Sequence, residues 1–209
     1  MKNRTCIILA GGSAERFGRD KGLLELGGRP LVLHVFERVR ELVDEVIAVV
    51  GSEEQKTEYS SVFPQGVKIH VDIKDGESPL IGALTGLARA SGSYSLLLPC
   101  DAPFISTEVI DLLFEASIGV DASIPRWPNG YIEPLQAVYR TRTALSAAEE
   151  AVDRGELRMR SMISRLRRVR YFSTMVLREL DPDLLTFFNV NTIMDLKRAE
   201  ALMRARRSR

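Results

Sequence analysis

Short apolar runs alternate along this chain with longer segments in which apolar residues recur every three or four positions. The clearest apolar runs cover residues 5–9, 46–50, 67–71 and 95–99. Segments with helical spacing follow at residues 30–43, 80–90 and 106–116, where Pro30 and Ser106 can begin their helices, and a polar stretch follows the run at 46–50 and continues to about residue 59. Such alternation is typical of parallel strands covered by helices. We therefore predict an α/β fold with a doubly wound, mostly parallel sheet and helices on both faces.

The pattern becomes less regular from about residues 120–124. Residues 131–139 have the pattern of an extended segment, and helical spacing returns at 144–154 and 158–166. A short strand at 169–172 then precedes a last helix at 192–206. Because the chain shows neither an internal repeat nor a low-complexity linker, we predict a single domain over residues 1–209.

Composition sets a few limits on function. With 45% hydrophobic residues the chain can bury one sizeable core, and its net charge of +1 gives no reason to expect nucleic acid or a membrane as a partner. No apolar run approaches the roughly 18 residues of a transmembrane helix, and the amino terminus lacks the apolar stretch of a signal peptide. We expect a cytoplasmic protein whose two cysteines, Cys6 and Cys100, serve packing.

A glycine-bearing loop follows the first apolar run directly. Residues 9–22 read Leu-Ala-Gly-Gly-Ser-Ala-Glu-Arg-Phe-Gly-Arg-Asp-Lys-Gly. Gly11 and Gly12 allow backbone N–H groups to approach an anion closely, and Arg16 and Lys21 add positive charge. The spacing fits neither a Walker A loop nor a dinucleotide fingerprint. The loop therefore predicts a phosphate-binding site of another kind, whereas an ordinary glycine turn would leave the two cations unexplained.

A carboxylate follows the apolar run at residues 95–99. Residues 96–104 read Leu-Leu-Leu-Pro-Cys-Asp-Ala-Pro-Phe, which places Asp101 at the same edge of a parallel sheet as the glycine loop. Because Mg²⁺ prefers carboxylate and phosphate oxygens, Asp101 is suited to hold a Mg²⁺ that also contacts nucleotide phosphates. The alternative is an aspartate that only stabilises the turn before Pro103.

Two further stretches carry polar groups where a ligand could bind. Asp72 follows the run at 67–71, and Gly82 lies in a segment that enters the next helix, although a plain connecting loop is the alternative for both. Near the carboxyl terminus, Asn189 and Asn191 stand one residue apart on an extended segment, so their carboxamides point the same way. The neighbouring Thr192 is also a good helix cap, so part of this motif can be structural.

In their order along the chain, these stretches resemble the motifs of the molybdenum cofactor guanylyltransferases, a family of nucleotidyltransferases. Phe17 stands where the family usually has Met, and Ser78 stands where it usually has Gly. The resemblance implies a Rossmann-like nucleotidyltransferase fold with Mg²⁺ as cofactor at Asp101. The nucleotide-binding residues that it implies are Leu9, Ala10, Gly11, Gly12, Lys21, Asp72, Gly82 and Asp101. The implied catalytic residues are Arg16, Lys21 and Asp101, and the implied acceptor-binding residues are Asn189 and Asn191.

Arginine is dense between residues 154 and 170. The residues concerned are Arg154, Arg158, Arg160, Arg165, Arg167, Arg168 and Arg170. Such charge runs are most often solvated helix faces. An acceptor that carries a phosphate would gain bidentate contacts from a few of them, and Arg158 is our candidate for this role.

The reaction that the resemblance implies is transfer of GMP from GTP to molybdopterin, with release of pyrophosphate. An attacking phosphate is largely dianionic at neutral pH, because its second pKa is about 6, and it needs no general base. Positioning and charge neutralisation would then carry the catalysis. We expect residues 1–118 to bind the nucleotide and residues 119–209 to bind the acceptor. Molybdoenzyme apoproteins or other cofactor-assembly proteins are the further partners that this reaction would involve.

Several other functions are compatible with the same motifs. One is a cytidylyltransferase for the same pterin or for a sugar or isoprenoid phosphate, although those relatives more often carry Ala-Ala-Gly where this chain has Ala10-Gly11-Gly12. Another is a guanylyltransferase for a different phosphorylated acceptor, such as a corrinoid precursor. A non-catalytic nucleotide-binding adaptor belongs to a different class, and the presence of both Lys21 and Asp101 argues against it.

Overall fold

The computed structural model describes residues 3–11, 20–73 and 78–207. These residues build a seven-stranded sheet from β1 (Arg4–Leu9), β4 (Glu45–Val50), β5 (Lys68–Val71), β6 (Tyr94–Pro99), β7 (Ala122–Arg126), β8 (Ala137–Arg140) and β9 (Val169–Ser173). The strands lie in the order β5-β4-β1-β6-β8-β7-β9. Within this sheet only β8 runs against its neighbours, since it pairs antiparallel with β6 and β7. The prediction of a mostly parallel sheet is confirmed.

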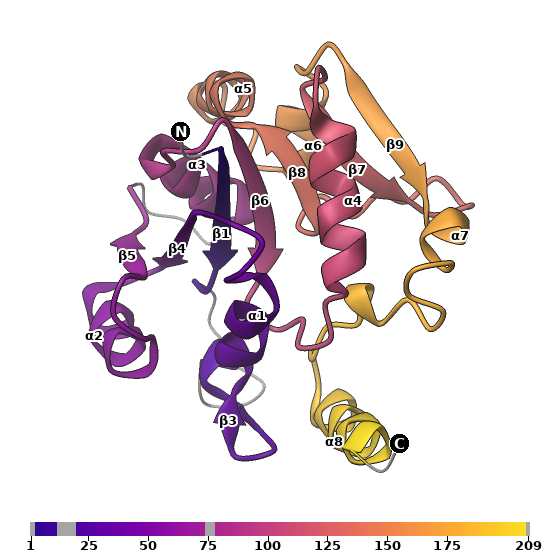
Figure 1. The fold of residues 1–209 in the computed structure, drawn as a ribbon. Coiled ribbons are helices and arrows are strands. Elements are labelled where there is room, and N and C mark those ends of the chain that lie inside the picture. The colour runs from indigo at the N-terminus through magenta and orange to yellow at the C-terminus, as the bar shows by residue number, and fades with distance from the viewer. Residues whose placement is uncertain (1–2, 12–19, 74–77, 208–209) are drawn as a thin grey trace.

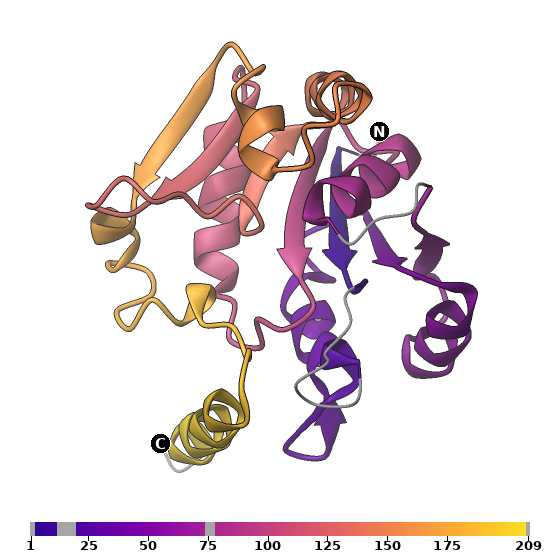
Figure 2. The same cartoon turned by 180° about the vertical axis from the view of Figure 1, so that it is seen from behind.

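Helices cover both faces of the sheet (Figures 1 and 2). One face packs against α1 (Leu31–Val39), α2 (Glu53–Val62) and α4 (Thr107–Ser117). The other face packs against α3 (Pro79–Arg89), α5 (Thr141–Asp153) and α6 (Met159–Ile163). Strand β1 shows the reason, because Cys6 and Ile8 belong to the first core and Ile7 to the second. A strand that is buried on both sides is therefore mostly apolar, and the predicted doubly wound arrangement is confirmed.

A third, smaller core lies beyond the edge at which the parallel strands end. It joins a hairpin of β2 (Glu25–Leu26) and β3 (Arg29–Pro30) to α8 (Ile193–Arg207), which lies apart from the sheet in Figure 1. Leu26, Leu31, Phe104 and Ala199 are buried together there. The hairpin turn uses Gly27 and Gly28, which both have positive φ. The remaining short elements are η1 (Lys21–Leu23), α7 (Thr174–Leu177) and η2 (Leu185–Phe187).

The first helix is shorter than its sequence pattern predicts. Pro30 pairs in β3 and precedes the helix, which ends at Val39 instead of continuing to residue 43. Beyond it the Leu42 amide donates to the Val39 carbonyl in a turn, and the Asp44 amide donates to Arg4 in β1. The apolar residues at 42 and 43 therefore pack against the core from a turn that leads into β4.

The second half of the chain also differs in detail from expectation. The region at 120–124 contains a regular strand, β7, which sequence reading missed because the strand has only five residues and includes Pro125. The extended segment at 131–139 is a strand only from Ala137 onward. The helix expected at 158–166 is limited to α6, after which the chain turns toward β9. Because β8 is antiparallel, the connection over residues 127–136 lies at the carboxyl edge of the parallel strands.

Across residues 3–11, 20–73 and 78–207, no helix combines the length and the apolar character needed to cross a membrane.

Candidate functional site

The residues that follow β1, β4 and β6 meet at one edge of the sheet. The Ala10 amide donates to the Val49 carbonyl at 2.7 Å, and the Cys100 amide donates to the Leu9 carbonyl at 3.1 Å. A Cβ on Gly11 would lie 2.9 Å from the Gly51 nitrogen, so only glycine fits this close approach of two backbones. The predicted residues Leu9, Ala10 and Gly11 are thus at the carboxyl edge, where ligands bind in open α/β sheets. The predicted residues Gly12 and Arg16 lie outside the described residues.

Lys21 connects two polar groups that are distant in the sequence. Its ammonium donates to Asn191 Oδ1 at 2.8 Å and lies 3.5 Å from Asp101 Oδ2. Asp101 is 7% exposed, and this burial raises the pKa of its carboxyl group while the ammonium of Lys21 opposes the rise. Three residues predicted from separate motifs therefore come together.

The second carboxylate oxygen of Asp101 is buried and accepts no hydrogen bond from the described residues. A buried, unpartnered carboxylate oxygen is costly, and a hard cation would satisfy it. Among the described residues no three His, Cys, Asp or Glu side chains gather in a way that could hold a metal ion by themselves. This fits Mg²⁺, which is commonly bound by one or two carboxylates together with water and substrate phosphates.

The segment with the two predicted asparagines is attached to the same place. The Val190 amide donates to the Asp101 carbonyl at 2.9 Å. Just beyond it, Asp195 Oδ2 accepts hydrogen bonds from the Asn191 amide, the Thr192 amide and the Thr192 hydroxyl. Together these hydrogen bonds cap the start of α8. The carboxylate of Asp195 thereby fixes the backbone from which Asn191 reaches Lys21.

Asn189 is held by a residue that sequence reasoning missed. Its Oδ1 accepts a hydrogen bond at 3.2 Å from the Nε2 of Gln136, which is 2% exposed. Gln136 ends the connection between β7 and β8, so this connection reaches the asparagine segment at the carboxyl edge. A polar residue directly before the apolar run at 137–139 was the available signal.

Asp72 and Gly82 lie against Leu9. A Cβ on Gly82 would be 3.2 Å from Leu9 Cδ2 and 3.7 Å from Asp72 Oδ1. The hydroxyl of Thr85 donates to Asp72 at 3.2 Å. Burial raises the pKa of Asp72 to about 6, against the opposing effect of that hydrogen bond. The predicted residues of β1, β5 and α3 therefore form a second group at the same edge.

The structure places Arg158 away from the asparagines. This exposed residue precedes α6, and the carbonyl of its neighbour Leu157 accepts a hydrogen bond from the Ser78 hydroxyl at the start of α3. No hydrogen bond or ion pair of the described residues joins it to Asn189 or Asn191. Arg158 thus lies beside the helix that follows Asp72.

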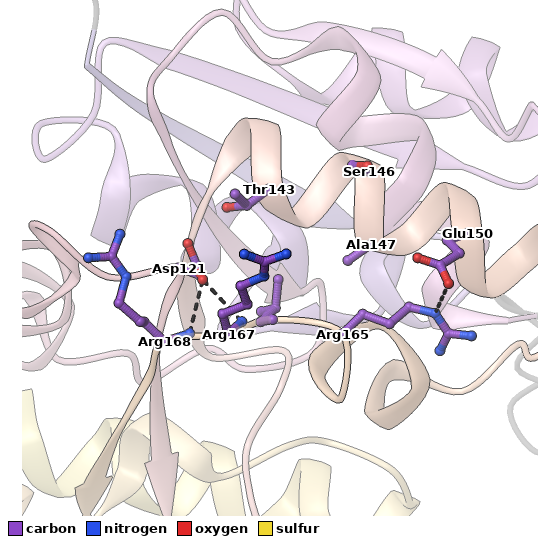
Figure 3. A pocket seen from close by; sticks show the side chains of 9 residues that line it. Asp121, Thr143, Ser146, Ala147, Glu150, Arg165, Arg167 and Arg168 are labelled. Carbon is purple, nitrogen blue, oxygen red and sulfur yellow. Dashed lines mark hydrogen bonds and ion pairs between the residues drawn. The ribbon is translucent and has the colours of Figure 1, made fainter.

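Other arginines of the cluster line a cavity of about 480 Å³ at the opposite edge of the sheet (Figure 3). Arg165, Arg167 and Arg168 lie on one side of it, and a stripe of α5 that includes Thr143 and Ser146 lies on the other (Figure 3). The backbone is fixed there, because Oδ2 of Asp121 accepts hydrogen bonds from the amides of Arg167 and Arg168. These arginines therefore lie at the edge of the sheet opposite to the site around Asp101.

Sequence reasoning also missed a group on α2. Gln55 and Tyr59 both donate hydrogen bonds to the carboxylate of Asp20, the residue directly before Lys21. The sequence predicted a polar, helical stretch that ends near residue 59 and assigned it no role in the site. The signal was Tyr59 itself, which is fully buried within a largely polar helix.

Comparisons with known proteins agree with this geometry. The sequence model of the MobA-like NTP transferase domain matches residues 6–169. The "Probable molybdenum cofactor guanylyltransferase" of Methanosarcina mazei is 36% identical over 199 residues, which cover 93% of this chain and 88% of the relative. The "Molybdenum cofactor guanylyltransferase" of Desulfosudis oleivorans is 33% identical over 205 residues, which cover 97% of each chain. The crystal structure of molybdopterin-guanine dinucleotide biosynthesis protein A from Archaeoglobus fulgidus superposes with a TM-score of 0.82 at 30% identity and covers 96% of this chain and 99% of that chain.

Proposed function

This chain belongs to the MobA-like NTP transferase family, and from that premise we propose that it is a molybdenum cofactor guanylyltransferase. It transfers GMP from GTP to molybdopterin and releases pyrophosphate. The observation that carries this proposal is the meeting of Lys21, Asp101 and Asn191 at the carboxyl edge of the sheet, where Gly11 packs against Gly51. With GTP as the donor, the cytoplasm is the proposed compartment.

The nucleotide occupies the edge formed by residues of the first half, 1–118. Backbone groups at Leu9, Ala10 and Gly11 face the base and phosphates, where the close packing on Gly51 leaves no side chain in the way. Asp72, beside Gly82, is the candidate hydrogen-bond acceptor for ribose or base. Gly12 and Arg16 complete the proposed phosphate site from the segment outside the described residues.

Lys21 and Asp101 serve the reacting phosphates. The ammonium of Lys21 lies at the sheet edge with 31% of its side chain exposed, so it is available to neutralise charge on the α-phosphate as the acceptor attacks in line. The unpartnered oxygen of Asp101 would hold Mg²⁺, which when bound supplies further neutralisation of the phosphate charges. No hydrogen bond of the described residues joins His34 or His70 to Lys21, Asp101 or Asn191, and His34 bonds instead to the Leu26 carbonyl. A phosphate nucleophile needs no histidine, because it is already deprotonated.

The acceptor lies on the side of residues 119–209. Asn191 reaches Lys21 beside Asp101 and Asn189 contacts Gln136, and their carboxamides offer the donors and acceptors that suit a pterin. Arg158 is retained as a candidate for the acceptor phosphate, although it lies beside α3 and would have to reach the substrate from that side. Apoproteins of molybdoenzymes are the proposed recipients of the product.

A titration by calorimetry tests the donor. The protein is titrated with GTP, CTP and ATP in Mg²⁺, and pyrophosphate release is then measured with molybdopterin as acceptor. We expect a preference for GTP that Asp101→Ala weakens. A preference for CTP would assign the chain to the cytidylyltransferases, and nucleotide binding without pyrophosphate release with molybdopterin would contradict the proposal and favour another acceptor or the adaptor.

Lys68 provides a matched control for Lys21. Each lysine pairs with a buried carboxylate, Lys21 with Asp101 at the carboxyl edge and Lys68 with Glu45 at the amino edge. Lys21→Met should lower turnover strongly, whereas Lys68→Met should leave turnover unchanged while disturbing stability. Equal losses in the two variants would mean that the effect of Lys21 is structural only.

A further inference from the structure

The carboxylate of Asp20 receives three hydrogen bonds immediately before Lys21. Its Oδ1 accepts from the Gly22 amide at 2.9 Å and from the Tyr59 hydroxyl, and its Oδ2 accepts from Gln55 Nε2 at 2.6 Å. The same side chain caps η1, the short helix that Lys21 begins. These three hydrogen bonds therefore fix the orientation of the Asp20 carboxylate, and they hold the backbone at Lys21 from one side.

Both donors on α2 are fixed in turn. Tyr59 is fully buried, and burial raises the pKa of its hydroxyl, so the group stays protonated and donates to Asp20. Gln55 Oε1 accepts from the Gly51 amide at 2.7 Å, which leaves its Nε2 to face Asp20. Tyr59 cannot turn away without leaving its buried hydroxyl without a partner, and a turn of Gln55 would break its bonds to both Asp20 and Gly51.

Gly22 is the position that makes this contact reachable. A Cβ on Gly22 would overlap the Tyr59 hydroxyl and would lie 3.1 Å from Cys100 Cβ. The absence of a side chain there opens the path along which the hydroxyl reaches Asp20. Cys100 precedes Asp101, so the same contact packs the Lys21 segment against the strand end that carries the candidate metal ligand.

The same part of α2 also supports Gly11. Gly51, which donates to Gln55, is the residue against which Gly11 packs. The chain on either side of residues 12–19 is therefore attached to one platform, made of Gly51, Gln55 and Tyr59. A platform of this kind sets the spacing between the backbone at Gly11 and the ammonium of Lys21.

We propose that Gln55 and Tyr59 are positioning residues, which act through Asp20 to hold Lys21 where its ammonium meets the phosphates. This inference rests on the proposed function, because it assigns the two side chains to the same transfer reaction. Neither side chain is offered as a contact to substrate; their effect passes entirely through Lys21. A displacement of about 1 Å in a positioning group can cost roughly 100-fold in rate. Removing the single hydroxyl of Tyr59 should therefore change the rate by a measurable amount.

A double-mutant cycle with Lys21 separates positioning from a merely structural role. Tyr59→Phe is made in the wild-type chain and in Lys21→Met, and both kcat/KM for transfer and the Kd for GTP in Mg²⁺ are measured below the onset of unfolding of each variant. We expect Tyr59→Phe alone to lower kcat/KM by about 10- to 100-fold. In the Lys21→Met background it should change either quantity less than about twofold, while its effect on the urea midpoint persists.

Tyr94→Phe is the control, because it also removes one tyrosine hydroxyl but lies at the amino edge, where that hydroxyl accepts from the Gly119 amide at 3.4 Å. It should leave kcat/KM unchanged. Gln55→Leu should reproduce the effect of Tyr59→Phe, again only when Lys21 is present. Equal losses from Tyr59→Phe with and without Lys21, or unchanged kinetics in the Lys21 chain, would overturn the proposal.

Failure of the proposed function can be distinguished from failure of the positioning role. If the wild-type chain transfers no GMP to molybdopterin, the proposed reaction fails, and the cycle is read from the Kd for GTP alone. In that case a loss of GTP affinity in Tyr59→Phe that depends on Lys21 still supports positioning, and a loss independent of Lys21 still rejects it.

Discussion

Gly22→Ala probes the contact beneath Lys21 and has a magnitude that follows from the structure. The added Cβ would overlap the Tyr59 hydroxyl, which must either compress its surroundings or leave Asp20. Overpacking costs about 1–3 kcal/mol, and loss of a hydrogen bond to a charged group costs about 1.5–3 kcal/mol. Because the two ranges overlap at about 1.5–3 kcal/mol, we expect the free energy of unfolding to fall by about that amount, with the melting temperature falling about 2–4 °C for each kcal/mol.

The same substitution in a Tyr59→Phe background should be much milder. Removal of the hydroxyl leaves only the contacts of the new Cβ with Cys100 Cβ and with the ring carbon Cζ of residue 59, both at 3.1 Å, which ask for shifts of a few tenths of an ångström. We expect Gly22→Ala to cost about 1 kcal/mol there. Urea denaturation of the wild type, the two single variants and the double variant gives the coupling free energy between the two substitutions. A coupling free energy below about 0.5 kcal/mol would refute the argument that the hydroxyl fills this space.

Three further predictions concern other parts of the molecule. The pKa of Asp72 is about 6 in the folded chain and about 3.9 in an unfolded one, so the folded state binds more protons between these values and the free energy of unfolding falls as pH rises from about 4 to 6. The expected fall is about 1–2 kcal/mol after allowance for partial exposure. Asp72→Asn should remove it, which denaturation curves at several pH values would show. Asp195→Ala should cost about 1 kcal/mol as a lost helix cap and raise the KM for the acceptor through Asn191, and an unchanged KM would separate the cap from the site. Arg167→Ala should leave GTP affinity and turnover unchanged, because its cavity lies at the other edge of the sheet, and a loss in either would show that the two edges communicate.

The sheet and the place of Asp101 at its carboxyl edge could be predicted because their causes are local. Strands buried on both faces are mostly apolar, and a carboxylate that closely follows such a strand lies at the carboxyl edge of the sheet; the sequence around Asp101 is therefore enough to place it there. The parallel arrangement then brings the residues after β1 to the same edge. The meeting of Lys21 with Asn191 goes further, because it joins residues that are 170 positions apart, and only the family resemblance put them in one site.

The parts that were missed depend on tertiary contacts that leave little local signal. Tyr59 sits in a helix that is otherwise polar, and nothing in its neighbours shows that it reaches Asp20 across the fold. Strand β7 carries a proline and has only five residues, so its pairing with β8 and β9 is a consequence of the sheet around it. The first helix ends at Val39 because the chain must turn to enter β4, although apolar spacing continues to residue 43.

The single reversed strand has a consequence for how this fold can evolve. In a wholly parallel sheet every connection that leaves the ligand-binding edge crosses back to the other edge, but β8 begins at that edge, so the connection over residues 127–136 both starts and ends there without a crossover helix. Its last residue, Gln136, contacts Asn189, which we propose binds the acceptor, while Gly11 and the strand end at Asp101 belong to other elements. Insertions and substitutions in this one connection could therefore change which acceptor is taken while the nucleotide chemistry stays as it is, and this offers a physical route by which one scaffold could diversify over many phosphorylated substrates.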